Sequence, residues 1–334
     1  MIVVDADVLG RHRTGEETYV LNLLRQLPSV APDLQFGAVT RHPELVPDGV
    51  EPLALAAHSQ ELRMAFLLPR LLRRLRPEVA HFQHVLPLGW RGPSVVTLHD
   101  LHFERDPSVM GLADRLTFKT FVPRSARRAA QVIAVSERTK RDAVELYGIP
   151  PGKITVTPHG VDPAFSPGDG SPHRGYLLFV GAIQARKDPL AAAEAAAAVG
   201  LPLVVAGPEK EPALARELRS RGVDVRGFVD TEQLAELYRG AAAFLLPSRY
   251  EGFGVPALEA MASGVPVVLS ADDALREVAG DAGVYAEDGD LTGAVRRALA
   301  DRERFARAGL ERAKEFSWEK TARLTAEVYR KAMA

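Results

Sequence analysis

Two glutamates in one glycine-rich segment have the chemistry needed to hold a phosphorylated molecule that carries vicinal hydroxyls. The segment 249–262 reads RYEGFGVPALEAMA and follows an apolar run at 243–246. Glu251 precedes a predicted helix and Glu259 lies within it, so the two carboxylates could flank a diphosphate. A carboxylate suits vicinal hydroxyls because it accepts two hydrogen bonds in a fork. The alternative is a solvated loop glutamate and a capping glutamate.

The glycines of this segment favour close contact between the backbone and a ligand. Gly252 and Gly254 lack a Cβ, so the chain can approach a bound group closely there. Pro256 suits the first turn of a helix. The amides of Phe253, Gly254 and Val255 are therefore expected at a helix N-terminus, which favours phosphate.

A pair of cations follows another apolar run. In the segment 180–189, VGAIQARKDP, Gly181 permits a turn, and Arg186 and Lys187 precede the next predicted helix. Two such cations could neutralise a leaving diphosphate without a metal ion, although two solvated basic residues would give the same pattern. No GxGxxG follows a predicted strand, and the sequence contains no GxxxxGK[ST]. The usual support for a nicotinamide-dinucleotide or P-loop site is therefore missing.

The candidates in the first half are a histidine and a glycine loop. His99 ends the apolar run 94–98, in LHDLH, where it could donate to a hydroxyl or contact a reacting centre. Asp100 is a second candidate there, and His102 is expected in a loop. Gly15 closes the loop 10–15, just where the next helix begins.

Two further patterns in the first half have functional and structural interpretations. His81 and His84, in HFQH, have a spacing that can suggest a metal site, but the sequence offers no evident carboxylate partner, so we expect no metal. The segment 67–77, LLPRLLRRLRP, is amphipathic with four arginines and could touch anionic lipid. Its alternative is a helix with one core face and one solvated face.

These candidates need parallel strands to bring them together. Short apolar runs alternate with longer amphipathic or alanine-rich stretches in both halves, which indicates doubly wound α/β sheets. Strands are predicted at 2–6, 34–39, 78–82, 94–98, 131–135 and 154–157, and at 176–180, 203–206, 223–226, 243–246, 265–269 and 283–285.

The stretch between the two halves has a different character. Residues 158–172 contain four prolines and three glycines, which cannot sustain a helix or a central strand. We expect an interdomain linker there, between a first domain at 1–160 and a second at 173–316. Ligands bind at the carboxyl ends of the strands in such sheets, so both domains are expected to face a central cleft.

Composition excludes several classes of protein. The 334 residues are 46% hydrophobic and 25% charged with a formal net charge of −1, which argues against wholesale disorder and against nucleic-acid binding through bulk positive charge. The absence of cysteine excludes disulfides and thiolate zinc sites. Apolar runs reach about six to eight residues where a membrane span needs about twenty. The N-terminal MIVVDADVLG does not read as a signal peptide, so a cytoplasmic location is expected.

Together the motifs closely resemble the family 4 retaining glycosyltransferases of the GT-B fold (glycosyl transferases group 1). The Arg-Lys pair at 186–187, GFV at 227–229 and the Glu-x7-Glu of Glu251 and Glu259 stand in the family's order and spacing. VSE at 135–137, PHGVD at 158–162 and FSW at 316–318 are also similar to that family. The resemblance covers nearly the whole chain and is strongest from about 130 to 320.

The resemblance implies a nucleotide-diphosphate sugar donor, linked to GDP or UDP, that the second domain holds. Arg186 and Lys187 would bind the diphosphate, Glu259 the ribose hydroxyls, and Glu251 the hydroxyls of the transferred sugar. The backbone at 252–255 would touch sugar and phosphate, and Gly181 would also bind the donor. Gly227, Phe228 and Val229 would lie along the base, with Phe228 as a core residue the alternative.

For the first domain the resemblance implies two contacts and one crossing. A functional histidine is common where His99 stands. The family often has two glycines where this sequence has ThrGly, so Gly15 would approach the donor phosphate. The last stretch, 317–334, is expected to form a helix that crosses back onto the first domain.

The predicted function is therefore retaining transfer of a sugar to an acceptor hydroxyl on a glycan, a lipid-linked molecule or a small molecule. The predicted catalytic residues are His99, Arg186, Lys187 and Glu251. Neither a metal nor another cofactor is expected. The location is cytoplasmic, with peripheral contact at the inner membrane face as a further expectation. Two alternatives remain, namely a GT-B-fold nucleotide-sugar epimerase and a non-catalytic, two-lobed sugar-binding protein.

Overall fold

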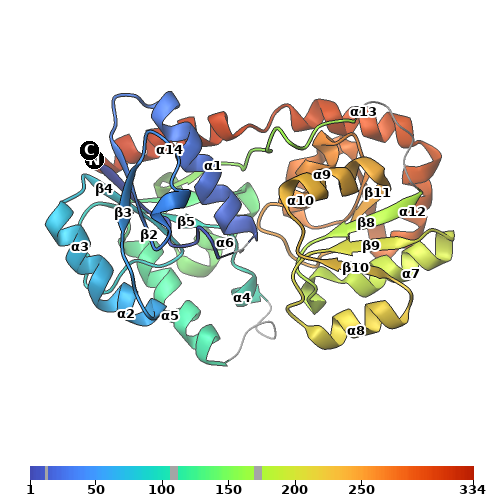
Figure 1. The fold of residues 1–334 in the computed structure, drawn as a ribbon, viewed down its shortest axis with the longest axis horizontal. Coiled ribbons are helices and arrows are strands. Elements are labelled where there is room, and N and C mark those ends of the chain that lie inside the picture. Colours follow the sequence, from blue (N-terminus) through green and yellow to red (C-terminus); the bar gives the residue numbers. More distant parts are fainter. Residues whose placement is uncertain (12–13, 106–111, 169–174) are drawn as a thin grey trace. The chain divides into compact units, whose positions relative to one another are not determined.

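In the computed structural model of the chain, the described residues are 1–11, 14–105, 112–168 and 175–334, and the chain divides into two compact units (Figure 1). Unit 1 comprises Met1–Gly160 and Ser317–Ala334, and unit 2 comprises Val161–Phe316. The end of the predicted linker and the start of the predicted second domain, at 169–174, lie outside the described residues. Each unit is built on its own parallel sheet.

The described part of unit 1 contains a seven-stranded parallel sheet in the order β3-β2-β1-β4-β5-β6-β7. Its strands are β1 (Ile2–Asp5), β2 (Phe36–Thr40), β3 (Glu51–Ala54), β4 (Val79–Gln83), β5 (Ser94–Leu98), β6 (Gln131–Ala134) and β7 (Ile154–Val156). Its helices are α1 (Thr14–Val30), α2 (Gln60–Leu62), α3 (Leu68–Leu75), α4 (His102–Arg105), α5 (Leu112–Arg128), α6 (Glu137–Tyr147) and α14 (Trp318–Met333). A π-helical turn, Arg63–Leu67, makes α2 and α3 one continuous helical run.

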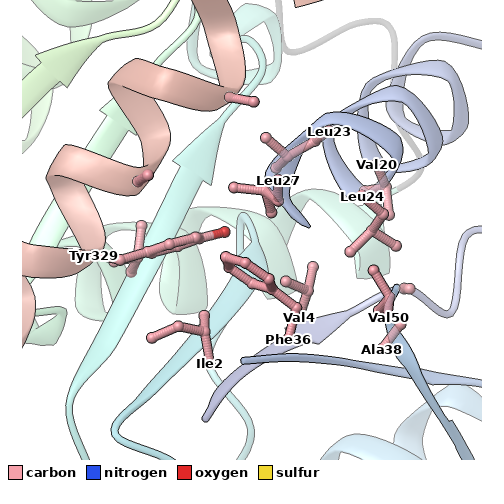
Figure 2. Packing of buried hydrophobic residues seen from close by; sticks show 14 of the residues in the cluster. Ile2, Val4, Val20, Leu23, Leu24, Leu27, Phe36, Ala38, Val50 and Tyr329 are labelled. Atoms are coloured by element: carbon pink, nitrogen blue, oxygen red, sulfur yellow. The ribbon is translucent and has the colours of Figure 1, made fainter. Parts of the chain in front are cut away.

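Helices cover both faces of this sheet. Side chains alternate between the two faces along each strand, so each face has apolar residues to bury. Ile2 and Val4 of β1 point to the face on which α1 and α14 pack, and Leu23 and Tyr329 belong to the same cluster (Figure 2). Val3 points to the opposite face, where buried residues of α3, α5 and α6 complete a second cluster. The final helix is thus part of the core of unit 1.

The chain leaves unit 1 and returns to it at one crowded crossing. A Cβ on Gly160 would collide with the backbone nitrogen of Trp318, so the close approach requires glycine there. Next to this contact, the hydroxyl of Thr321 donates to the carbonyl oxygen of Pro158 over 2.6 Å. The start of α14 is therefore fixed against the segment that ends the first half of the chain.

Unit 2 contains, in its described part, a six-stranded parallel sheet in the order β10-β9-β8-β11-β12-β13. Its strands are β8 (Tyr176–Val180), β9 (Leu203–Ala206), β10 (Asp224–Gly227), β11 (Ala241–Leu246), β12 (Val267–Ser270) and β13 (Gly283–Ala286). Its helices are α7 (Pro189–Val199), α8 (Pro212–Ser220), α9 (Thr231–Gly240), α10 (Val255–Ala262), α11 (Asp273–Ala279), α12 (Leu291–Ala300) and α13 (Arg302–Ala313). In both sheets the strand order reverses beside the first strand, between β1 and β4 and between β8 and β11.

The predicted doubly wound α/β architecture is confirmed, and every predicted strand is present with its ends shifted by at most two residues. One strand, β3, was not predicted; it is an edge strand whose residues EPLA are mostly exposed. It lacks an apolar run because it buries little, and its Pro52 is tolerated because an edge strand needs fewer amide donors. Within the described residues, no helix has the length and apolar character to cross a membrane.

Candidate active site

The predicted site residues form two groups, one on each unit. In unit 2, β8 and β11 are hydrogen-bonded neighbours at the point where the strand order reverses, so the loops that follow them begin at the same sheet edge. The first loop contains a short 3₁₀ turn, Ala185–Lys187, and the second contains Glu251. The Nζ of Lys187 donates to Oε1 of Glu251 over 2.8 Å.

Arg186 also connects these two loops through hydrogen bonds. Its side chain is buried, its Nη1 donates to the carbonyl oxygen of Tyr250, and its own carbonyl accepts from the amide of Arg249 at 3.0 Å. Burial raises the pKa of the Glu251 carboxyl, but the charges of Lys187 and Arg186 more than offset this, so the pKa lies below its ordinary value. Glu251 is therefore an ionised carboxylate held between two cations.

Gly181 makes room for the lysine. It has φ +152°, and a Cβ built there would lie 3.0 Å from Cδ of Lys187, closer than real Cβ contacts normally are. A side chain at this position would push the ammonium away from Glu251. Gly181 thus leaves the space that the Lys187 side chain occupies.

The segment 252–255 leads into α10 as the sequence predicts. Gly254 has φ +107° and caps the helix, so the amides of Phe253, Gly254 and Val255 lie at its N-terminus. Gly252, Phe253 and Gly254 are buried, and the Phe253 ring packs edge-on against Phe316 with centroids 5.9 Å apart. The partial positive charge of a helix N-terminus lies directly after Glu251 in the chain.

Glu259, one helical turn further on, has a different environment. Its carboxyl is buried in α10 and accepts a hydrogen bond of 2.9 Å from the hydroxyl of Tyr238 on α9. Burial raises the pKa of Glu259 to about 8, with Asp162 adding to the rise and Tyr238 opposing it. The two glutamates of the motif therefore differ in charge at neutral pH, since Glu251 is ionised and Glu259 is mostly protonated.

Gly227, Phe228 and Val229 end β10 and begin the turn that follows it. Gly227 adopts the left-handed region with φ +68°. The Phe228 side chain is 54% exposed, so the alternative that places it in the core is wrong. Val229 is half-buried. An exposed aromatic ring at the end of a strand has the chemistry to stack on a planar ligand.

In unit 1, His99 follows β5 and lies in a cluster of rings. Its Nε2 lies 2.8 Å from Oε1 of Gln83, its ring stacks on His159 at an interplanar angle of 8°, and Tyr19 contacts it edge-on with centroids 4.9 Å apart. Burial lowers the pKa of His99 to about 4, with Glu16 opposing the shift and His84 adding to it. The imidazole is therefore neutral at pH 7, and Gln83 fixes its orientation.

A carboxylate partner for His84 is present, although the sequence analysis found none. Nε2 of His84 lies 3.4 Å from Oε1 of Glu16, and His84 has a left-handed backbone with φ +59°. Burial lowers the pKa of His84 and the Glu16 contact raises it, with a net rise. Gly15, beside Glu16, is exposed, and a Cβ there would meet nothing within 4 Å, so no close contact inside unit 1 requires glycine.

The two histidines of HFQH have separate partners. Whereas His84 faces Glu16, His81 is fully buried with Nε2 2.7 Å from the hydroxyl of Thr97 and Nδ1 2.7 Å from that of Tyr329. The described residues hold no group of three or more acidic or histidine side chains arranged to bind a metal ion. Asp100 pairs with His102 at 2.6 Å, and His102, expected in a loop, begins α4.

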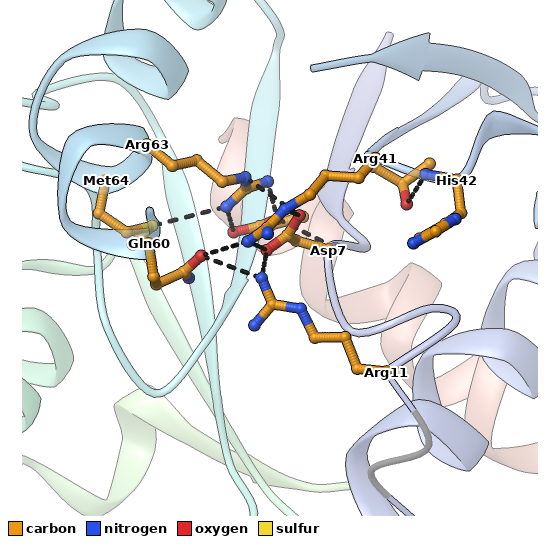
Figure 3. Close-up of polar contacts among 9 residues, drawn as sticks. Asp7, Arg11, Arg41, His42, Gln60, Arg63 and Met64 are labelled. Atoms are coloured by element: carbon orange, nitrogen blue, oxygen red, sulfur yellow. Dashed lines mark hydrogen bonds and ion pairs between the residues drawn. The ribbon is translucent and has the colours of Figure 1, made fainter. Parts of the chain in front are cut away.

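A second polar cluster in unit 1 escaped the sequence analysis (Figure 3). Asp5 at the end of β1 lies 2.5 Å from Nη2 of Arg63, whose side chain is fully buried. Asp7 accepts from Arg11 and, at 2.9 and 3.0 Å, from Arg41. The acidic residues of VDAD at 4–7 were the available signal, but their arginine partners come from three separate segments.

Both halves of the chain match family models, in agreement with the resemblance carried by the motifs. Residues 13–165 match Glycosyltransferase Family 4, and residues 169–315 match Glycosyl transferases group 1. The chain is 30% identical over 267 residues to the O-antigen chain mannosyltransferase B of Escherichia coli, covering 71% of this chain and 70% of that protein. It is 32% identical over 272 residues to a D-inositol 3-phosphate glycosyltransferase of Geodermatophilus obscurus, covering 70% of this chain and 60% of that protein.

Solved structures show the same fold at low sequence identity. Sucrose-phosphate synthase from Thermosynechococcus elongatus has a TM-score of 0.76 at 21% identity, covering 98% of each chain. WaaG, a glycosyltransferase involved in lipopolysaccharide biosynthesis, has a TM-score of 0.74 at 19% identity, covering 98% of this chain and 99% of that one. The chain therefore belongs to the glycosyltransferases of the GT-B fold, with a family 4 first half and a group 1 second half.

Proposed function

We propose that the protein is a retaining glycosyltransferase that moves a sugar from a nucleotide-diphosphate donor to an acceptor hydroxyl. The observation that carries this proposal is the arrangement around Glu251 in unit 2. An ionised carboxylate, two cations and a helix N-terminus follow two adjacent strands at the carboxyl edge of the sheet. Phosphate and hydroxyl groups are the ligand chemistry that such an arrangement fits.

Each group would have a distinct role in the transfer. Negative charge grows on the diphosphate as the bond to the sugar breaks, and Lys187, Arg186 and the α10 amides would stabilise that charge. Glu251 would accept hydrogen bonds from the hydroxyls of the transferred sugar, and it also holds the Lys187 ammonium in place. Glu259 would bind the ribose, and the exposed ring of Phe228 would lie along the base together with Gly227 and Val229.

The stereochemical course that we propose is a front-face route. The leaving phosphate would help to take the proton of the acceptor hydroxyl, whereas double displacement would need a nucleophilic carboxylate beneath the sugar. The neutral imidazole of His99 would contact the sugar as a hydrogen-bonding group and not as a cation. The diphosphate would be neutralised by Arg186 and Lys187, without a metal ion.

UDP- and GDP-sugars are the donors that we propose to test first. The names of the relatives include a mannosyltransferase, several D-inositol 3-phosphate glycosyltransferases and an α-maltose-1-phosphate synthase. Their acceptors differ, and the chain spans only 57–66% of the inositol phosphate glycosyltransferases it matches. The acceptor is therefore proposed as a class, a hydroxyl on a glycan, a lipid-linked molecule or a small molecule.

A thermal-shift screen over nucleoside diphosphates and nucleotide sugars tests the donor site, because a ligand of the folded state raises the melting temperature by mass action. NMR of the product formed from the stabilising donor and a panel of acceptors then gives its anomeric configuration. Retention is expected. Inversion would contradict the proposal, and conversion of the donor with no acceptor present would favour an epimerase instead.

A further inference from the structure

The helical run α2–α3 exposes large apolar side chains on its outer side. Leu62, Phe66 and Leu67 are 51%, 65% and 38% exposed, whereas Leu68 and Leu72 of the same run are buried in the core of unit 1. The loop after β4 adds Leu88, which is 60% exposed and whose amide donates to the carbonyl oxygen of Met64 over 2.9 Å. We call Leu62, Phe66, Leu67 and Leu88 the apolar patch.

Arginines continue the same surface. Arg70 follows Phe66 by four residues and so lies on the same side of the helix, and Arg73 lies near Gly89 of the loop that carries Leu88. Five exposed arginines in or next to the patch form no ion pair with any residue in the described ranges; they are Arg70, Arg73, Arg74, Arg76 and Arg91. The run 60–76 contains a single acidic residue, Glu61, which is exposed.

Some, but not all, arginines elsewhere on the protein surface form ion pairs. Arg219 and Arg221 in unit 2 contact Glu209 and Glu194, and Arg330 in unit 1 contacts Asp33. Around the apolar patch the positive charge is left uncompensated. The partner that fits is apolar at its centre and negative at its surface.

We propose that this surface binds an anionic lipid bilayer. The apolar patch would enter the boundary between headgroups and acyl chains, and the arginines would meet the lipid phosphates, as amphipathic interfacial helices do. A second copy of the chain is the poorer occupant, because a two-fold interface would set five arginines against the same five arginines. The proposal does not rest on the transferase activity.

Sedimentation of the full chain with vesicles tests the proposal. Binding is expected to vesicles of phosphatidylcholine with phosphatidylglycerol, and not to vesicles of phosphatidylcholine alone. Salt should weaken it, because the screening length falls from about 10 Å at 0.1 M to about 3 Å at 1 M ionic strength. Equal binding to both kinds of vesicle, or to neither, would overturn the proposal whether or not the chain transfers sugar.

Two sets of variants separate the charge from the apolar patch. The triple change Arg70→Gln, Arg73→Gln and Arg74→Gln should weaken binding about a hundredfold, since each basic residue near an anionic surface is worth about fivefold. The matched control changes Arg216 and Arg219 of α8 and Arg221, which follows the helix, to Gln; it removes the same net charge and should leave binding unchanged. The same loss in both triples would show attraction by net charge alone and would contradict the proposed surface.

For the apolar patch, Phe66→Ser should weaken vesicle binding about tenfold through lost apolar burial, whereas Met333→Ser, at an exposed position of α14, should have no effect. Phe66→Trp should retain binding, and its added fluorescence should shift to the blue with anionic vesicles. Analytical ultracentrifugation without lipid supplies the remaining outcome. A dimer that Phe66→Ser dissociates would assign the patch to self-association and overturn the lipid proposal.

Discussion

The hydroxyl of Tyr329 lies 2.7 Å from Nδ1 of His81, although 248 residues separate them in the chain. Nε2 of His81 contacts the hydroxyl of Thr97, which also lies 3.2 Å from the hydroxyl of Tyr19. This buried chain of hydrogen bonds joins the last helix to β4, β5 and α1. It ends at the tyrosine whose ring supports His99, so α14 contributes directly to the support of the candidate site in unit 1.

Removal of the Tyr329 hydroxyl should destabilise unit 1. Burial lowers the pKa of His81 to about 3, so its imidazole is neutral and needs a partner at each nitrogen. Tyr329→Phe leaves Nδ1 buried without one, which costs about 1–3 kcal/mol of unfolding free energy. Tryptophan fluorescence during urea unfolding measures this, because Trp90 and Trp318, the two tryptophans of the sequence, both lie in unit 1.

The matched control for this change is Tyr147→Phe. The Tyr147 hydroxyl donates to Glu104 over 3.2 Å, and that carboxylate is partly exposed, so water can replace the lost bond. A smaller loss is expected, of about 0.5–1.5 kcal/mol. If both variants lose the same stability, the buried chain of hydrogen bonds has no special role.

Lys187→Ala should slow sugar transfer about 10²–10³-fold, the usual effect of removing one electrostatic donor from a developing negative charge. It should also weaken binding of the free nucleoside diphosphate. The change removes a cation, and it leaves the Glu251 carboxylate, which contacts that ammonium at 2.8 Å, as an uncompensated negative charge that repels the diphosphate. Lys210→Ala, which removes an exposed lysine from the same unit, is the control and should leave both values unchanged. Activity should survive a chelator. Complete loss with EDTA that Mg²⁺ or Mn²⁺ restores would contradict neutralisation by the two cations.

Local patterns were sufficient to predict the strands and the loops of the unit 2 site. The apolar runs mark buried strands, and Glu251, Glu259 and the cation pair lie within short segments that follow two of those strands. The exposed edge strand β3 has no such run, so its position was missed.

Contacts between distant segments could not be predicted from those patterns. The pairing of Glu16 with His84 depends on how α1 packs beside the end of β4, and the burial of Arg63 depends on a π-helical turn without a sequence signature. The difference in pKa between Glu251 and Glu259 likewise comes from burial and from Tyr238, which lies on another helix. A single sequence contains the residues but not these neighbours.

The two glutamates should have separable effects on binding and turnover. If Glu259 holds ribose, Glu259→Gln should weaken binding of the free nucleoside diphosphate. If the transferred sugar is the only part of the donor that Glu251 touches, Glu251→Gln should reduce turnover and largely spare that affinity, because the glutamine amide oxygen can still accept a hydrogen bond from Lys187. Isothermal titration with the nucleoside diphosphate and steady-state kinetics with the full donor measure the two effects. Equal loss of nucleotide affinity in both variants would contradict the separate roles.

Gly254→Ala should destabilise unit 2 more than an ordinary glycine replacement. Gly254 has φ +107°, and an added Cβ would lie 2.6 Å from Cδ2 of Leu275, so backbone strain and a steric clash combine. Gly200→Ala is the control, because Gly200 has φ +72° with nothing within 4 Å of the added Cβ. The difference in unfolding free energy between the two variants is expected to be about 1–3 kcal/mol. Equal values, measured by circular dichroism during unfolding, would show that Leu275 moves aside freely.

The protonation of Glu259 should make the stability of unit 2 depend on pH. Its folded pKa of about 8 lies above its ordinary value of 4.5, so its contribution is fully present below pH 4.5 and is lost as the pH rises through 8. Glu259→Gln does not titrate. The unfolding free energy of the parent should therefore fall relative to that of the variant, by up to about 1.4 kcal/mol per pH unit across this window. A constant difference would contradict the raised pKa.

Binding of a nucleoside diphosphate should release this proton. A ribose hydroxyl that donates to Glu259 stabilises the carboxylate and lowers its pKa, so at pH 7 the parent should lose up to about one proton per nucleotide bound. Isothermal titration in two buffers with different ionisation enthalpies measures the release. Glu259→Gln should show only the protons that come from the nucleotide phosphates, whereas Glu251→Gln, whose substituted carboxyl is already ionised in the parent, should match the parent. The same buffer dependence in the parent and in Glu259→Gln would place the ribose away from Glu259.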